Sequence, residues 1–93
     1  MTNVVTKHLI VTGRVQRVGY RNYMAYKANQ FHITGWVRNR LDGSVEAVVQ
    51  GTPENVEAII VRAHRGPPKA EVTSVVVNDG SGEFAGFETL PTA

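Results

Sequence analysis

Residues 34–50 read T-G-W-V-R-N-R-L-D-G-S-V-E-A-V-V-Q, and the dipeptide Asp42-Gly43 separates two runs of alternating residues. An Asp-Gly pair in this position is a strong signal for a tight β-hairpin. We therefore predict one strand over Thr34–Arg40 and a second over Ser44–Gln50. The second strand is apolar on one face and mostly polar on the other. This pattern predicts an antiparallel sheet that is covered on a single side.

A helical pattern lies on each side of this hairpin. Before it, apolar residues recur every three or four positions over the segment Arg21–Phe31, which is the spacing of one helix face. After it, Thr52 and Pro53 have the residue types of an N-cap and a first helical residue. The apolar spacing then continues as far as Arg65, where a Gly-Pro-Pro sequence stops the helix.

Three further segments have the composition of strands, at Lys7–Arg14, at about Glu71–Asn78 and at Phe84–Leu90. The order is then β-α-β-β-α-β with a short extra strand at the carboxyl end. Two amphipathic helices can cover one face of an antiparallel sheet. We predict an α+β fold, a ferredoxin-like two-layer sandwich with both helices on one face of the sheet. Such a fold supports many functions and identifies none by itself.

The size and composition exclude several classes of protein. The 93 residues suffice for one domain, with an ordered core over about residues 7–90. There are no cysteines, which excludes disulfides, thiolate catalysis and cysteine-bound zinc. The three histidines, His8, His32 and His64, lack the spacing of metal ligands, so we expect no metal site.

Charge and hydropathy bear on location and partners. No apolar run approaches the length of a membrane span, and the first residues do not read as a secretory signal, so we expect a cytoplasmic protein. The net charge is only +2, which is a weak argument for a nucleic-acid partner. No spare apolar helix face remains, and a monomer is the expectation.

The segment Gly13–Arg21, G-R-V-Q-R-V-G-Y-R, connects the first predicted strand to the first predicted helix. A tight strand-to-helix turn leaves backbone N–H groups pointing at one spot, and the helix N-terminus adds partial positive charge there. Arginines at positions 14, 17 and 21 surround it. The segment is a candidate site for an anion, most naturally phosphate.

Two residues stand out as candidates for chemistry. Arg21 lies at the loop–helix junction, where a cation is unfavourable because it opposes the helix dipole. A bound anionic ligand would explain its presence there. Its planar guanidinium can bind two phosphate oxygens. Asn39 precedes the hairpin turn, and its neutral amide can orient a water molecule. Taken alone, Asn39 is better explained as a residue that begins a turn.

Taken together, the segments Gly13–Arg21 and Gly35–Gly51 resemble the paired motifs of the acylphosphatases, small enzymes that hydrolyse the carboxyl–phosphate bond of acyl phosphates. The resemblance extends over most of the chain, including the stretch from Gly66 to Val72. It implies the same α+β sandwich, a small acyl phosphate as substrate, and no metal or cofactor. It also implies that Arg21 binds the phosphate and Asn39 positions the attacking water. Backbone N–H groups would complete the phosphate site, from Gln16, Arg17, Val18, Gly19 and Tyr20.

Arg17 departs from the family pattern, which has glycine at this place. A loop that requires positive φ there makes any other residue cost about 1–2 kcal/mol. The arginine is tolerated with its side chain in solvent, adds a second cation for the substrate, or damages the site. The last possibility leaves an acylphosphatase-like anion-binding domain with weak or no turnover. A further alternative is a single-stranded RNA binder on the same fold, although the strand Ser44–Gln50 has no aromatic residue on which bases could stack.

Overall fold

The hairpin predicted around Asp42 is present in the computed structural model, which describes residues 3–93. Most predicted element ends lie within one or two residues of those observed, as is usual for helix and strand termini. Over the described residues the elements are β1 (Val5–Arg14), α1 (Tyr20–Gln30), β2 (Thr34–Asn39), β3 (Val45–Gly51), α2 (Pro53–Arg65), β4 (Glu71–Asp79) and β5 (Phe87–Thr89).

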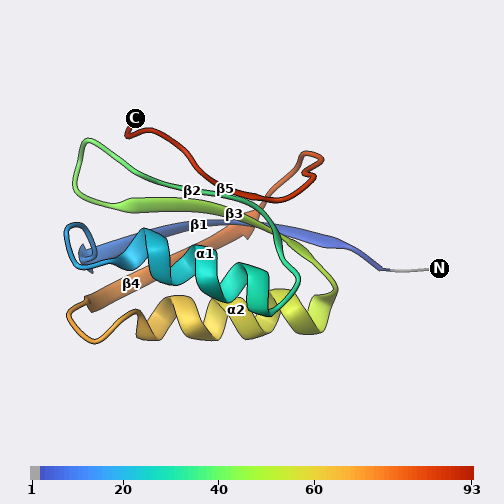
Figure 1. Ribbon diagram of the computed structural model, residues 1–93, viewed down its shortest axis with the longest axis horizontal. Coiled ribbons are helices and arrows are strands. Elements are labelled where there is room, and N and C mark those ends of the chain that lie inside the picture. Colours follow the sequence, from blue (N-terminus) through green and yellow to red (C-terminus); the bar gives the residue numbers. More distant parts are fainter. Residues whose placement is uncertain (1–2) are drawn as a thin grey trace.

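The strands form one sheet in the order β4-β1-β3-β2-β5, and both helices pack side by side against one face of it (Figure 1). The core lies between the two layers. It contains the predicted helix stripes, represented by Tyr20 and Met24 of α1 and by Val56 and Ile59 of α2. The predicted fold class, an α+β sandwich of the ferredoxin-like kind, is confirmed. Within residues 3–93, neither helix is long and apolar enough to cross a membrane.

The last strand differs from its prediction in length and in direction. β5 comprises only Phe87–Thr89 instead of Phe84–Leu90, and it pairs parallel to β2 while the other strand pairs are antiparallel. The chain beyond it continues beside β2. The N–H of Leu90 donates to the Val37 carbonyl at 2.9 Å, and the N–H of Ala93 donates to the Asn39 carbonyl at 3.1 Å. The end of β2 that carries Asn39 is therefore bounded by backbone on both sides.

β3 is buried on both faces, although its sequence alternates. Val45, Ala47 and Val49 face the helices as predicted, but Glu46 on the opposite face is also only 7% exposed. β3 is the middle strand of five, and long side chains from its neighbours cover this face. Glu46 accepts hydrogen bonds from His8 of β1 and Arg38 of β2, at 2.6 and 2.8 Å.

Candidate active site

The loop between β1 and α1 presents a row of unpaired backbone donors. β1 ends in a bulge after Thr12, and α1 begins after Gly19, whose φ of 81° is in the left-handed region. The first helical hydrogen bond runs from the N–H of Tyr23 to the carbonyl of Gly19. Within residues 3–93, none of the N–H groups from Gln16 to Asn22 donates to another backbone or side-chain acceptor. These free N–H groups can bind the oxygens of an anion.

The start of α1 is electropositive. Its N-cap, Gly19, provides no side-chain hydrogen bond, and its first turn has no acidic residue. Arg21, the second residue of the helix, is half-buried and lines a cavity of about 230 Å³ together with Arg17, Gly19 and Tyr20. A cation at this position opposes the helix dipole. An anion in the cavity would be attracted by Arg21, by the dipole and by the free N–H groups at the same time.

Tyr20 anchors the start of α1 with its side chain. Its ring is buried in the core, and its hydroxyl donates to the carbonyl of Ala63 in α2 at 2.7 Å. Burial, together with the neighbouring Tyr23 hydroxyl, raises the pKa of Tyr20. The phenol therefore stays neutral, and the side chain of Tyr20 fixes α1 against α2.

Arg17 has the strained backbone that its replacement of a family glycine suggested. Its φ is 62°, in the left-handed region, where residues other than glycine are uncommon. Its side chain is exposed and forms no hydrogen bond or ion pair with any of residues 3–93. Beside it, Val18 is half-buried against the core. The side chain of Arg17 therefore adds positive charge to the loop without stabilising the fold.

The side chain of Gln16 connects this loop to the hairpin through a contact that the sequence does not predict. Its Nε2 donates to the carbonyl oxygens of Arg40 and Ser44, both at 2.8 Å. The hairpin itself is closed by Asp42, which accepts from the N–H and hydroxyl of Ser44. The sequence contains no local signal for the Gln16 contact, because its partners are backbone atoms 24 and 28 residues away.

Asn39 lies at the end of β2 nearest to this loop. It pairs with Val45, which also pairs with Val11 near the end of β1. By strand alternation it shares the helix-covered face with Val37. Its Oδ1 is buried and has no hydrogen-bond partner within residues 3–93. A buried carbonyl oxygen without a donor costs free energy, so this atom is suited to accept a hydrogen bond from a water molecule at the site.

The arginines on either side of Asn39 are engaged elsewhere. Arg38 Nε binds Glu46 at 2.8 Å, and an Arg40 guanidinium nitrogen lies 3.7 Å from the same carboxylate. Burial raises the pKa of Glu46, but hydrogen bonds and charge from His8 and Arg38 outweigh it and hold the pKa below its usual value. The network fixes Arg38 and Arg40, whereas Arg17 and Arg21 line the cavity at the start of α1.

The structure thus brings together the predicted site residues in two groups. Arg17, Gly19, Tyr20 and Arg21 line one cavity, whose lining does not include Gln16 or Val18. Asn39 lies beyond that lining, on the adjoining end of β2. Gln16 links the groups through Arg40, the residue next to Asn39. Within residues 3–93, no group of three or more histidine, aspartate or glutamate side chains is arranged to hold a metal ion.

Comparison with known proteins gives one consistent result. The family model described as acylphosphatase matches residues 7–89. An acylphosphatase of Cupriavidus necator is 52% identical over 87 residues, covering 94% of this chain and 95% of the relative. One of Thiobacillus denitrificans is 52% identical over 83 residues, covering 89% and 93%. The solved structure of an acylphosphatase from Coxiella burnetii matches with a TM-score of 0.91 and 30% identity, covering 95% of this chain and 94% of that one.

Proposed function

Since the chain belongs to the acylphosphatase family and hydrolyses the carboxyl–phosphate bond of acyl phosphates, we propose that Arg21 holds the phosphoryl group and Asn39 positions the attacking water. The phosphoryl oxygens bind in the cavity at the start of α1. The guanidinium of Arg21 forms two charge-assisted hydrogen bonds to them. The N–H groups of the loop bind the remaining oxygens, from Gln16, Arg17, Val18, Gly19 and Tyr20.

Asn39 has the chemistry that a water-positioning residue needs. Its Oδ1 accepts a hydrogen bond from the water, and its neutral amide does not titrate. A water bound there would supply the donor that this buried Oδ1 lacks within residues 3–93. Placing the water in line with the bond that breaks lowers the entropic part of the barrier.

The reaction requires no strong acid or base from the protein. The water oxygen forms a bond to phosphorus, and the bond from phosphorus to the acyl oxygen breaks. The carboxylate departs with the electron pair, and because it is a weak base it needs no proton. The proton of the water passes to a phosphoryl oxygen, giving inorganic phosphate. Arg21 and the N–H groups stabilise the charge on the phosphoryl oxygens, and no step uses a metal or cofactor.

The observation that carries this proposal is the half-buried Arg21 at the start of a helix whose first N–H groups have no acceptor within residues 3–93. The test is the hydrolysis of acetyl phosphate by wild type, Arg21→Ala and Lys27→Ala. Lys27 is a cation of the same helix that lies outside the cavity. We expect Arg21→Ala to lose at least about 100-fold in kcat/KM, and Lys27→Ala to stay within about twofold. Undiminished hydrolysis by a folded Arg21→Ala variant contradicts the proposal.

We also propose that residues 7–90 act as a single domain and that the protein is a cytoplasmic monomer without a nucleic-acid partner. The low net charge and the use of both apolar helix stripes in one core support this. On the sheet face opposite the helices, the buried Glu46 would also disfavour a nucleic-acid backbone. Gel filtration at several protein concentrations tests the monomer, and a concentration-dependent shift to twice the mass contradicts it.

A further inference from the structure

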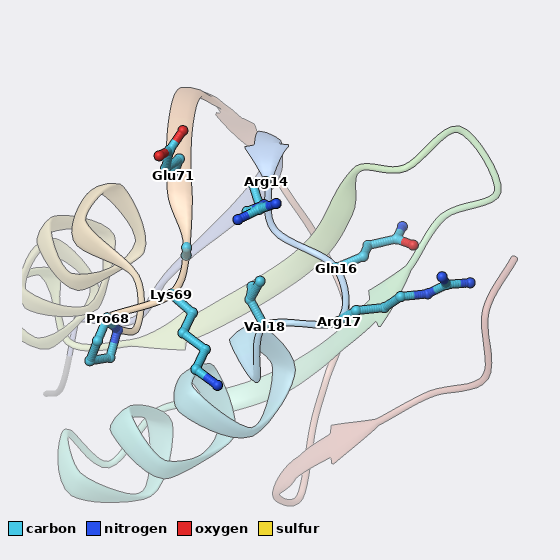
Figure 2. A pocket seen from close by; sticks show the side chains of 8 residues that line it. Arg14, Gln16, Arg17, Val18, Pro68, Lys69 and Glu71 are labelled. Carbon is cyan, nitrogen blue, oxygen red and sulfur yellow. The ribbon is translucent and has the colours of Figure 1, made fainter.

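A second cavity, of about 620 Å³, lies beside the phosphate cavity and is lined by Arg14, Arg17, Val18, Pro68, Lys69 and Glu71, among others (Figure 2). Arg17 lines both cavities. When the phosphoryl group of a substrate is bound at the start of α1, this second cavity therefore lies next to the acyl part of that substrate.

The second cavity is strongly cationic. Three of its lining residues are positive and one, Glu71, is negative. Glu71 pairs with Arg14 across β1 and β4, yet neither residue forms an ion pair within residues 3–93. Lys69 is equally unpaired there. These unpaired cations lie next to a site for acyl phosphates, and they can attract an anionic group on the ligand.

The three cations do not point the same way. Figure 2 shows Arg14 and Lys69 on either side of Val18, while the Arg17 side chain extends away from both, beside Gln16. The apolar side chains of Val18 and Pro68 lie in the same cavity as Arg14 and Lys69. An acyl group could pack its carbon atoms on these two side chains and place a charged end near either cation.

We propose that Arg14 and Lys69 form a specificity subsite for acyl phosphates whose acyl part carries a second anionic group, a carboxylate or a phosphate. This inference rests on the proposed placement of the phosphoryl group at the start of α1. Both cations are exposed, so the preference they create is moderate and weakens as salt is added. The negative charge of Glu71 reduces this preference.

The test compares two substrates that differ only in a terminal group, 4-carboxybenzoyl phosphate and 4-methylbenzoyl phosphate. The ring prevents the carboxylate from attacking its own acyl group. The quantity measured is the ratio of kcat/KM for the carboxylated substrate to that for the methylated one. We expect Arg14→Gln with Lys69→Gln to lower this ratio about tenfold. The kcat/KM for the methylated substrate should stay within about twofold of wild type.

Two single variants complete the design. Lys7→Gln removes one cation at the far end of β1, outside the second cavity, and should leave the ratio unchanged. Glu71→Gln should raise the ratio. If wild type hydrolyses the methylated substrate but the double variant keeps the wild-type ratio, the subsite is wrong while the proposed function stands. If wild type hydrolyses neither substrate, both fail.

Discussion

Arg17 shows how a single residue can carry strain at a ligand site. Its backbone has a φ of 62°, and its side chain makes no hydrogen bond or ion pair within residues 3–93 that would offset the cost. Backbone strain that no side-chain contact offsets is often found in loops that bind a ligand. The loop geometry that exposes the N–H groups to phosphate depends on this conformation.

We predict that Arg17→Gly stabilises the protein. Glycine reaches positive φ without the steric cost of about 1–2 kcal/mol, but it gains entropy in the unfolded chain, so the net rise in the free energy of unfolding is about 0.5–1 kcal/mol. Urea denaturation measures this. Turnover should equal or exceed that of wild type, because the free N–H groups keep their positions.

The matched control is Arg17→Ala, which removes the same charge but keeps a side chain at positive φ. It should show no gain in the free energy of unfolding. Equal stabilisation in both variants would mean that the arginine charge, and not the backbone, is the source of the effect.

At the scale of elements, the site depends on holding the β1–α1 loop against the β2–β3 hairpin. Gln16 makes this contact through two hydrogen bonds of 2.8 Å. On the other side, the N–H of Leu41 donates to the carbonyl of Ala93, and the N–H of Ala93 donates to the carbonyl of Asn39. Asn39 is thereby fixed relative to the loop by backbone and side-chain contacts from two directions.

We predict that Gln16→Met lowers kcat at least about tenfold, because the hairpin that carries Asn39 is no longer tied to the loop. The free energy of unfolding should fall by about 1–3 kcal/mol, the net value of two hydrogen bonds. Steady-state kinetics with acetyl phosphate and urea denaturation give the two numbers.

Gln50→Met is the control for this change. Gln50 Nε2 also donates two hydrogen bonds of 2.8 Å, to Thr6 Oγ1 and to the Gly82 carbonyl, at the other end of β3. It should destabilise the fold to a similar extent and leave kcat within about twofold of wild type. A similar loss of turnover in both variants would show that reduced stability, and not the lost contact between the loop and the hairpin, explains the Gln16 result.

The elements that the sequence predicted are those with a local pattern. The hairpin followed from Asp42-Gly43, and both helices followed from their apolar spacing. The parallel pairing of β5 did not, because three residues carry little periodicity and the partner strand is distant in sequence. The motifs predict Arg21 and Asn39 as site residues, but the Gln16 contact and the second cavity depend on tertiary packing that no spacing encodes.

At the scale of the whole molecule, the buried carboxylate of Glu46 links three strands. It lies on β3 and accepts hydrogen bonds from His8 on β1 and Arg38 on β2. Burial raises its pKa, but the contacts with His8 and Arg38 prevail and lower it from 4.5. A lowered pKa in the folded state means that ionised Glu46 stabilises the fold above the unfolded pKa.

We predict that this stabilisation is present above about pH 5 and is lost as the pH falls through the lowered pKa of Glu46. Glu46→Gln should therefore lower stability near neutral pH and flatten the decline of stability in acid. Urea midpoints measured from about pH 7 to about pH 3 for both proteins test this. Parallel curves would contradict the assigned role of Glu46.

We propose that Arg21 binds the phosphoryl group and that Asn39 positions the water. The kinetics of Asn39→Ala with acetyl phosphate, with inorganic phosphate as a competitive inhibitor, test these separate roles most directly. We predict a loss of about 100-fold or more in kcat, because the water is no longer placed. The inhibition constant of phosphate should stay within about twofold of wild type, because Arg21 and the loop still bind it. A folded Asn39→Ala enzyme with wild-type kcat, or one that loses phosphate binding and turnover together, would contradict the account.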